Sequence, residues 1–107
     1  MMDKNKFNIV DYIPVGHDNA ISRKELCRLT GLNDRKIREE IAKARESACI
    51  CNMSDGAGYY IPEQLAEITD YINQESARAR SIFKALKGAR IAKNMMQQER
   101  SEGLSIR

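Results

Sequence analysis

The side chains that catalyse reactions or bind metals are few in this sequence. Cys49 and Cys51 have the spacing that places two side chains on one face of a strand, which would supply half of a zinc site. The chain offers no second pair of zinc ligands, since it contains three cysteines and one histidine. That histidine, His17, has no acid or nucleophile at a useful spacing for acid-base catalysis. We therefore expect no enzyme, no metal site, no cofactor and no disulfide, with a loop histidine and buried cysteines.

Basic side chains offer a different chemistry, which is contact with phosphate. Between residues 22 and 46, eight Lys and Arg stand against five Asp and Glu. Between residues 76 and 94, six Lys and Arg occur with no acid among them. The net charge of +3 is too small to indicate a polyanionic partner by itself, so the distribution of charge is the stronger observation. Both stretches are candidates for phosphate contact.

A pair of short helices is predicted to position the first basic stretch. Ser22 and Glu25 have the spacing of a capping box, and Ile21 with Leu26 has that of a hydrophobic staple, so a helix begins after Ser22. Gly31 takes the left-handed conformation readily and ends it. The sequence therefore predicts a short first helix and a tight turn at the glycine.

The second helix of the pair starts almost at once. Asn33 is a good N-cap, and Leu32 with Ile37 repeats the staple spacing. About three residues thus join two capped helices, which predicts a helix-turn-helix over residues 22–46, where the second helix reads the DNA major groove. Its expected buried stripe consists of Ile37, Ile41, Ala44 and Ala48.

Long hydrogen-bond donors are concentrated where a reading helix meets base edges, at its N-terminal end. The acids Asp34, Glu39 and Glu40 would repel DNA unless they accept from cytosine or pair with neighbouring Arg or Lys. The alternative for these charges is a solvated helix face. The residues expected to contact DNA are Arg23, Lys24, Asn33, Arg35, Lys36, Arg38, Glu39 and Lys43.

The helix pair is flanked by weaker signals. Residues 6–13 predict a short helix with Phe7, Val10 and Ile13 on one stripe, ended by a proline. Residues 49–61 predict a hairpin, or wing, around a glycine-containing turn, with one of Tyr59 and Tyr60 packed inside and the other outside. The turn, residues 54–58, carries an acid and no Lys or Arg, so phosphate contact by the wing is doubtful.

The remainder predicts a helical extension over residues 62–99 that starts at Pro62, with a frayed tail over 100–107. A seven-residue repeat fits one long helix, or two helices broken near residues 74–77 or at Gly88. The basic side chains Arg80, Lys84 and Lys87 form a stripe that is a solvated face, a nucleic-acid contact or a site for an acidic protein partner. Dimerisation is expected through Leu65, Ile68, Ile72, Ala79, Ile82, Leu86 and Ala89, although the repeat could instead pack on its own domain.

The segment from Ser22 to Ile41 resembles the winged helix-turn-helix family. Gly58 to Pro62, followed by an acidic and then Arg-rich helix, resembles small helix-turn-helix proteins of phages and mobile elements of low-GC bacteria. The resemblance implies three helices and a small antiparallel sheet over residues 1–61, with the helix from Asp34 as the reading element. It also implies a role that ranges from repressor to replication accessory.

Composition agrees with an ordinary globular chain. With 107 residues, 42% hydrophobic and 31% charged, there is room for one domain and an appendage, and no apolar run approaches the roughly 20 residues of a membrane span. We expect a mainly helical, cytoplasmic, homodimeric protein that binds double-stranded DNA sequence-specifically and regulates transcription or replication of a phage or mobile element. The alternative is a protein-interaction module on the same fold, such as a phage-borne inhibitor or assembly adaptor, with no essential DNA binding.

Overall fold

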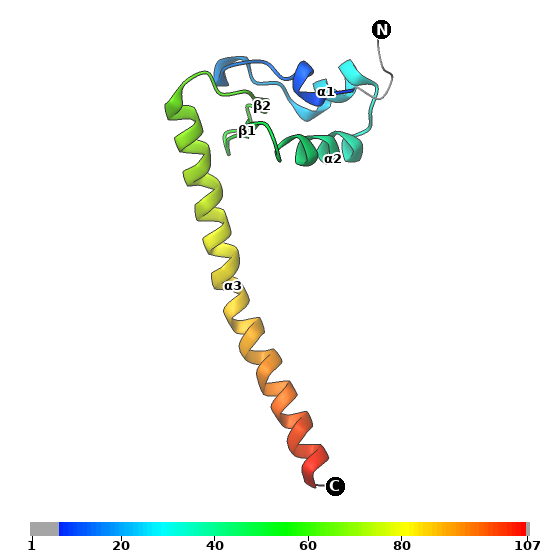
Figure 1. Cartoon of the computed structure of the whole chain (residues 1–107), viewed down its shortest axis with the longest axis vertical. Coiled ribbons are helices and arrows are strands. Elements are labelled where there is room, and N and C mark those ends of the chain that lie inside the picture. The colour runs from blue at the N-terminus through cyan, green and yellow to red at the C-terminus, as the bar shows by residue number, and fades with distance from the viewer. Residues whose placement is uncertain (1–6, 107) are drawn as a thin grey trace. The chain divides into compact units, whose positions relative to one another are not determined.

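The computed structural model describes the backbone of residues 7–106 and the side chains of residues 7–101. The chain forms two compact units, Met1–Asn73 and Gln74–Arg107. The prediction of a mainly helical chain with a small hairpin and a long C-terminal helix is confirmed (Figure 1). The elements are η1 (Ile9–Tyr12), η2 (His17–Asn19), α1 (Arg23–Thr30), α2 (Asp34–Ala44), β1 (Cys51–Asn52), β2 (Tyr59–Tyr60) and α3 (Leu65–Ile106).

The first predicted helix is a four-residue 3-10 helix, η1, rather than an α-helix. It is short because Ile13 precedes Pro14, and the proline ring disfavours helical backbone there, where φ is −102° and ψ is 121°. The predicted stripe is partly wrong: Ile9 and Ile13 are buried, whereas Phe7 is 40% exposed. Lys6, the predicted start, lies outside the described residues.

The caps of α1 and α2 form as predicted, with one difference. The Ser22 hydroxyl accepts from the Glu25 backbone N–H at 3.0 Å, and the Asn33 side chain accepts from the Lys36 N–H at 2.8 Å. Gly31, at φ 77°, ends α1 and donates its N–H to the Cys27 carbonyl at 2.9 Å. The Glu25 carboxylate does not complete a capping box, because it accepts from the Arg28 guanidinium at 3.0 Å.

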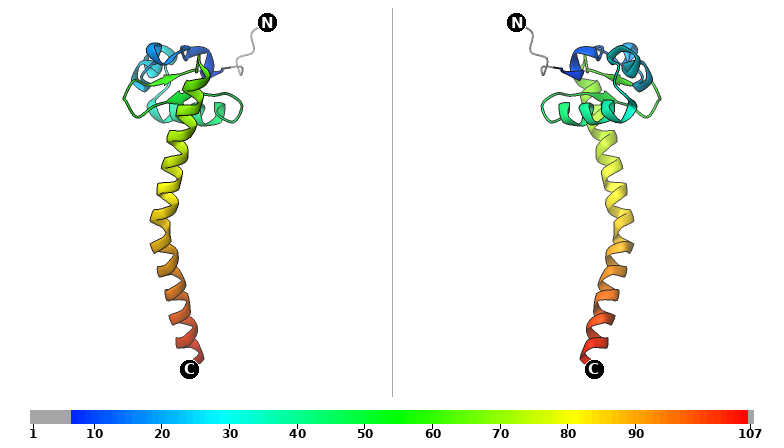
Figure 2. Two further views of the ribbon diagram at one scale, coloured as in Figure 1. Left: turned by 90° about the vertical axis from the view of Figure 1, so that its left-hand side faces the viewer. Right: turned by 90° about the vertical axis from the view of Figure 1, so that its right-hand side faces the viewer.

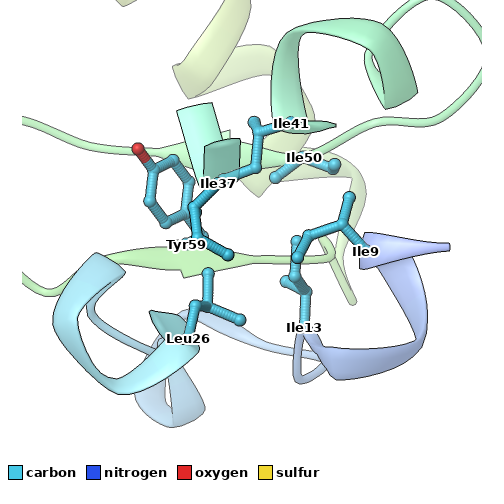
Figure 3. Close-up of a cluster of buried hydrophobic side chains, with 7 residues drawn as sticks. All are labelled: Ile9, Ile13, Leu26, Ile37, Ile41, Ile50 and Tyr59. Carbon is cyan, nitrogen blue, oxygen red and sulfur yellow. The ribbon is translucent and has the colours of Figure 1, made fainter. Parts of the chain in front are cut away.

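One apolar core holds the first unit together (Figure 3). Ile37 and Ile41 on α2 meet Leu26 on α1, and these side chains are at most 2% exposed. Burial of a Leu or Ile side chain contributes about 1.5–3 kcal/mol, so this core fixes which face of α2 turns outward. The cluster consists of Ile9, Ile13, Leu26, Ile37, Ile41, Ile50 and Tyr59, and Ala44 packs against it, partly buried.

Strand β2 is paired on more than one side. It pairs antiparallel with β1, with Cys51 opposite Tyr60. Ile21, just before α1, exchanges backbone hydrogen bonds of 2.9 and 2.7 Å with Tyr59. Both tyrosines are buried, at 6% and 2% exposed, so the prediction that one lies outside is wrong. Tyr59 packs in the apolar core, and the Tyr60 ring is covered by His17, a residue distant in sequence.

Helix α3 is continuous from Leu65 to Ile106, with no break near residues 74–77 or at Gly88 (Figure 2). It begins three residues after Pro62, the predicted first position. The backbone is helical through Ile106, where the sequence predicted a frayed end from residue 100. Every side chain from residue 77 to 101 is exposed. No helix within the described residues is apolar over a length that could cross a membrane.

Candidate nucleic-acid interface

The connection between α1 and α2 is three residues long and is fixed by local hydrogen bonds. The Thr30 hydroxyl donates to the Leu26 carbonyl at 2.7 Å and accepts from the Leu32 N–H at 3.2 Å. Leu32 is partly buried against the core, as a staple residue should be. Since α2 buries Ile37, its preceding and following residues are exposed. The chain therefore holds the first turns of α2 at the surface in one orientation.

A single carboxylate organises the start of that surface. Asp34 accepts from the Arg23 Nε with one oxygen and pairs with the Arg38 Nε at 3.2 Å with the other. It therefore links the first turn of α1 to the first turns of α2. The pKa of Arg23 is raised, first by its hydrogen bond with the Tyr59 hydroxyl and then by that with Asp34. Exposed pairs of this kind stabilise a fold by no more than about 1 kcal/mol.

A second exposed pair follows one turn further. The Arg35 Nε lies 3.1 Å from a Glu39 oxygen. The guanidinium groups remain accessible, since the side chains of Arg35 and Arg38 are 84% and 61% exposed. Asp34 and Glu39 thus meet the condition under which acids are tolerated on a DNA-facing helix, which is pairing with a neighbouring arginine. A paired arginine can exchange its carboxylate for a phosphate or a guanine edge, because all three accept from its donors.

The structure brings most of the predicted contact residues together. Arg23 and Arg38 share Asp34, Arg35 pairs separately with Glu39, and Lys36 is exposed on the same part of α2. Lys24 is exposed on the first turn of α1. The Asn33 side-chain oxygen is used for capping. Lys43 lies apart, in the last turn of α2, where it lines a hollow of about 480 Å³ beside Phe7.

An acidic hollow beside the hairpin was not predicted. It measures about 540 Å³, and His17 and Asp55 lie in its wall. His17 Nε2 is 2.5 Å from an Asp55 oxygen, and its ring meets the Tyr60 ring edge-on, with the centroids 5.0 Å apart. The pKa of Asp55 is lowered, first by the Ala57 N–H and then by His17. The acid in the wing turn is therefore used within the fold, and nothing local in the sequence signals its pairing with a residue 38 positions away.

Glu67 has a similar structural role at the start of α3. Its carboxylate accepts backbone N–H bonds from Glu63, from Gln64 at 3.1 Å and from His17 at 3.1 Å. These three bonds lower the pKa of Glu67, because they stabilise its charged form. Glu67 lies in the first turn of α3, near the positive end of the helix, and no local spacing in the sequence indicates its tie to His17. The start of α3 is thus bound to the loop that precedes α1.

The two hairpin cysteines differ in environment. Cys51 is buried, whereas Cys49 is exposed, so the prediction that Cys49 and Cys51 are both buried is wrong for Cys49. Their sulfur atoms are 3.8 Å apart. Burial, followed by the hydrogen bond with Cys49, raises the pKa of Cys51 to about 12. Among the described side chains of residues 7–101, no three His, Cys, Asp or Glu gather as metal ligands would.

We expect thiol labelling to separate these cysteines in the folded protein. In a Cys27→Ser background at pH 8, Cys49 should react at least about a hundredfold faster than Cys51, because the thiolate is the reactive species and a pKa near 12 leaves almost none of it. The rates are measured with a thiol-reactive chromophore and by mass spectrometry, and urea should abolish the difference. Equal rates in the native state would show that Cys51 is not enclosed as described.

Comparison with models of protein families, with curated proteins and with solved structures finds no match for this chain.

Proposed function

We propose that this chain is a winged helix-turn-helix protein that binds double-stranded DNA in a sequence-specific manner and regulates transcription or replication, of a phage or mobile element. The order of elements supports the winged form: η1, the bridge at Ile21, α1, α2 and then the β1–β2 hairpin. The family resemblance implies three helices and a small antiparallel sheet, and the proposal assigns the short η1 to the position of the first helix. On this proposal α2 is the reading helix.

The observation that carries the proposal is the outward face of α2. Ile37 and Ile41 are buried, and this leaves Arg35, Lys36 and Arg38 exposed around the N-terminal half of the helix. An α-helix with its side chains is about 10–12 Å across, so α2 can enter a major groove about 12 Å wide and 8.5 Å deep. Arginine is the usual bidentate partner of guanine, and Arg23 and Lys24 on α1 are placed to contact phosphate.

A salt titration of duplex binding tests this function. Contacts by the five cations Arg23, Lys24, Arg35, Lys36 and Arg38 would release about four to five counterions, so affinity should fall several-hundredfold between 50 and 200 mM salt. Fluorescence anisotropy with a random-sequence duplex measures this without knowledge of the preferred site, and selection from random duplexes then identifies that site. Absence of duplex binding at 50 mM salt would contradict the proposal.

The second candidate is a protein-interaction module with the winged fold and no essential DNA binding. It is favoured by one specific observation, which is that Arg23, Arg35 and Arg38 each already have a carboxylate partner in the described part of the chain. DNA phosphates would compete with these carboxylates for the guanidinium donors, whereas a protein partner that carries both charges could add to the existing pairs. If the chain binds duplex DNA only weakly, and its affinity does not change with salt concentration, the protein-interaction module is favoured.

We also propose that the chain forms a homodimer through the apolar side chains of α3. Its support is the repeat of apolar residues along one continuous helix, together with their exposure. A two-fold dimer suits a regulator, because it can present two reading helices to successive half-sites about 34 Å apart.

A further inference from the structure

Most of the apolar stripe of α3 is exposed in the single chain. Leu65 is 78% exposed, Ile72 55% and Ile82 57%. The first turns of α3 belong to the first unit and are tied to it by Glu67, which accepts from His17, and by Tyr71, whose ring lies 5.5 Å from the Arg45 guanidinium. Ile68 and Glu75 are partly buried, and the other positions of the stripe are exposed. Its ten positions are Leu65, Ile68, Ile72, Glu75, Ala79, Ile82, Leu86, Ala89, Lys93 and Met96.

Charge is segregated along the same helix. Residues 63–75 contain four acids and no Lys or Arg, whereas residues 78–93 contain six Lys and Arg and no acid. A second copy in parallel register would place each block beside a block of the same sign. Within the stripe it would also place Glu75 against Glu75 and Lys93 against Lys93. Like charges at facing positions destabilise a helix pair, so the parallel arrangement is disfavoured.

An antiparallel second copy removes these conflicts in a single register. With the two helices crossing at residue 77, Leu65 lies opposite Ala89, Ile68 opposite Leu86, and Ile72 opposite Ile82 of the second copy. The acidic block of each chain then runs beside the basic block of the other. The paired length is 25 residues, about 37 Å. The stripe thus buries its apolar side chains and matches opposite charges at the same time.

Glu75, the charged residue near the middle of the apolar stripe, can form an ion pair in this register. Glu75 falls opposite Ala79 of the second copy, beside that copy's Arg78. In the single chain Glu75 pairs with its own Arg78 at 3.4 Å. In the antiparallel pair, two Glu75 and two Arg78 side chains meet at the crossing point, so the carboxylate that enters the apolar seam remains paired.

We propose that α3 pairs with α3 of a second copy in antiparallel direction, centred near residue 77. The inference rests on the proposed homodimer and adds its direction and register. The partner on this surface is a second copy of the chain for two reasons. The apolar stripe is complementary to itself, and the reversal of charge along the helix is matched by an antiparallel copy.

Spin labels on full-length protein measure the direction. Cys27 and Cys49 are replaced by serine, Cys51 is buried, and single cysteines are introduced as Ser81→Cys or Asn94→Cys, both exposed positions. For antiparallel pairing, the two labels at 81 lie about 12 Å apart along the helix axes, and those at 94 about 51 Å apart. For parallel pairing, both distances stay under about 25 Å, set by the 8–10 Å between helix axes and the length of the labels.

Pulsed electron paramagnetic resonance should therefore give a short intermolecular distance at 81 and a distance near 50 Å at 94. Short distances at both positions would overturn the antiparallel direction while the homodimer stands. No intermolecular distance at either position would overturn both the direction and the dimer. DNA binding is measured on the same labelled proteins by anisotropy, so failure of the dimer and failure of duplex binding are scored separately.

Discussion

The Arg35→Ala, Arg38→Ala double variant should bind the preferred duplex at least about 30-fold more weakly than the parent chain. Each arginine that contacts a base edge contributes about 1–3 kcal/mol of discrimination, so removing two costs at least about 2 kcal/mol. Both side chains are well exposed and neither supports the core, so the fold should persist. Binding is measured by gel shift on the selected site and on a scrambled duplex, and specificity between the two should collapse as well.

The control for loss of one exposed, paired arginine outside α2 is Arg28→Ala. Arg28 is exposed and paired with Glu25 in the same way, but it lies in the last turn of α1 rather than on α2. The Arg28→Ala variant loses one positive charge. Its affinity for all duplexes should therefore fall slightly, and its preference for the selected site should be unchanged. If the double variant and this control behaved alike, α2 would not be the reading helix.

The Gly58→Ala variant should lose about 3 kcal/mol or more of stability. Gly58 has a φ of 111°, and an added Cβ would lie 2.2 Å from the Ile21 carbonyl oxygen. The backbone would have to move, and this would break the two hydrogen bonds between Ile21 and Tyr59, each worth about 1 kcal/mol, on top of about 1–2 kcal/mol for the strained conformation. Urea denaturation followed by circular dichroism measures the loss.

Gly56→Ala separates steric conflict from backbone strain in the same turn. Gly56 has a φ of 78°, but no atom lies within 4 Å of an added Cβ. It should therefore cost only about 1 kcal/mol, which is the penalty for a left-handed alanine. Equal losses for the two variants would mean that Ile21 does not pair with β2 as described.

The features that could be predicted from the sequence are those determined within one turn of helix. Ser22 and Asn33 cap helices because their side chains reach a backbone N–H three residues on, and Gly31 ends α1 for reasons of its own conformation. The buried face of α2 follows from the spacing of Ile37 and Ile41. These local rules also placed Arg35 and Arg38 on the outward face, so most of the candidate interface was predictable.

The features that were missed depend on contacts between distant segments. Asp55 is held by His17, and Ile21 pairs with Tyr59, over separations of 38 residues each. No local spacing encodes such contacts, and their consequence, the burial of both tyrosines, was missed with them. The sequence did not distinguish one helix from two beyond residue 62. A glycine such as Gly88 destabilises a helix by only about 1 kcal/mol, which is too little to force a break.

The exposure of residues 77–101 has a consequence for how this helix is maintained. A helix without tertiary contacts relies on intrinsic propensity, and nucleation is costly, so burial of the apolar stripe must supply much of its stability. If that burial occurs only between copies, ordering of the segment and association are one equilibrium governed by mass action. The helix content of the chain should then rise with its concentration. Under the proposed function, the concentration of the chain would also set the fraction of copies that are paired and able to occupy two half-sites together.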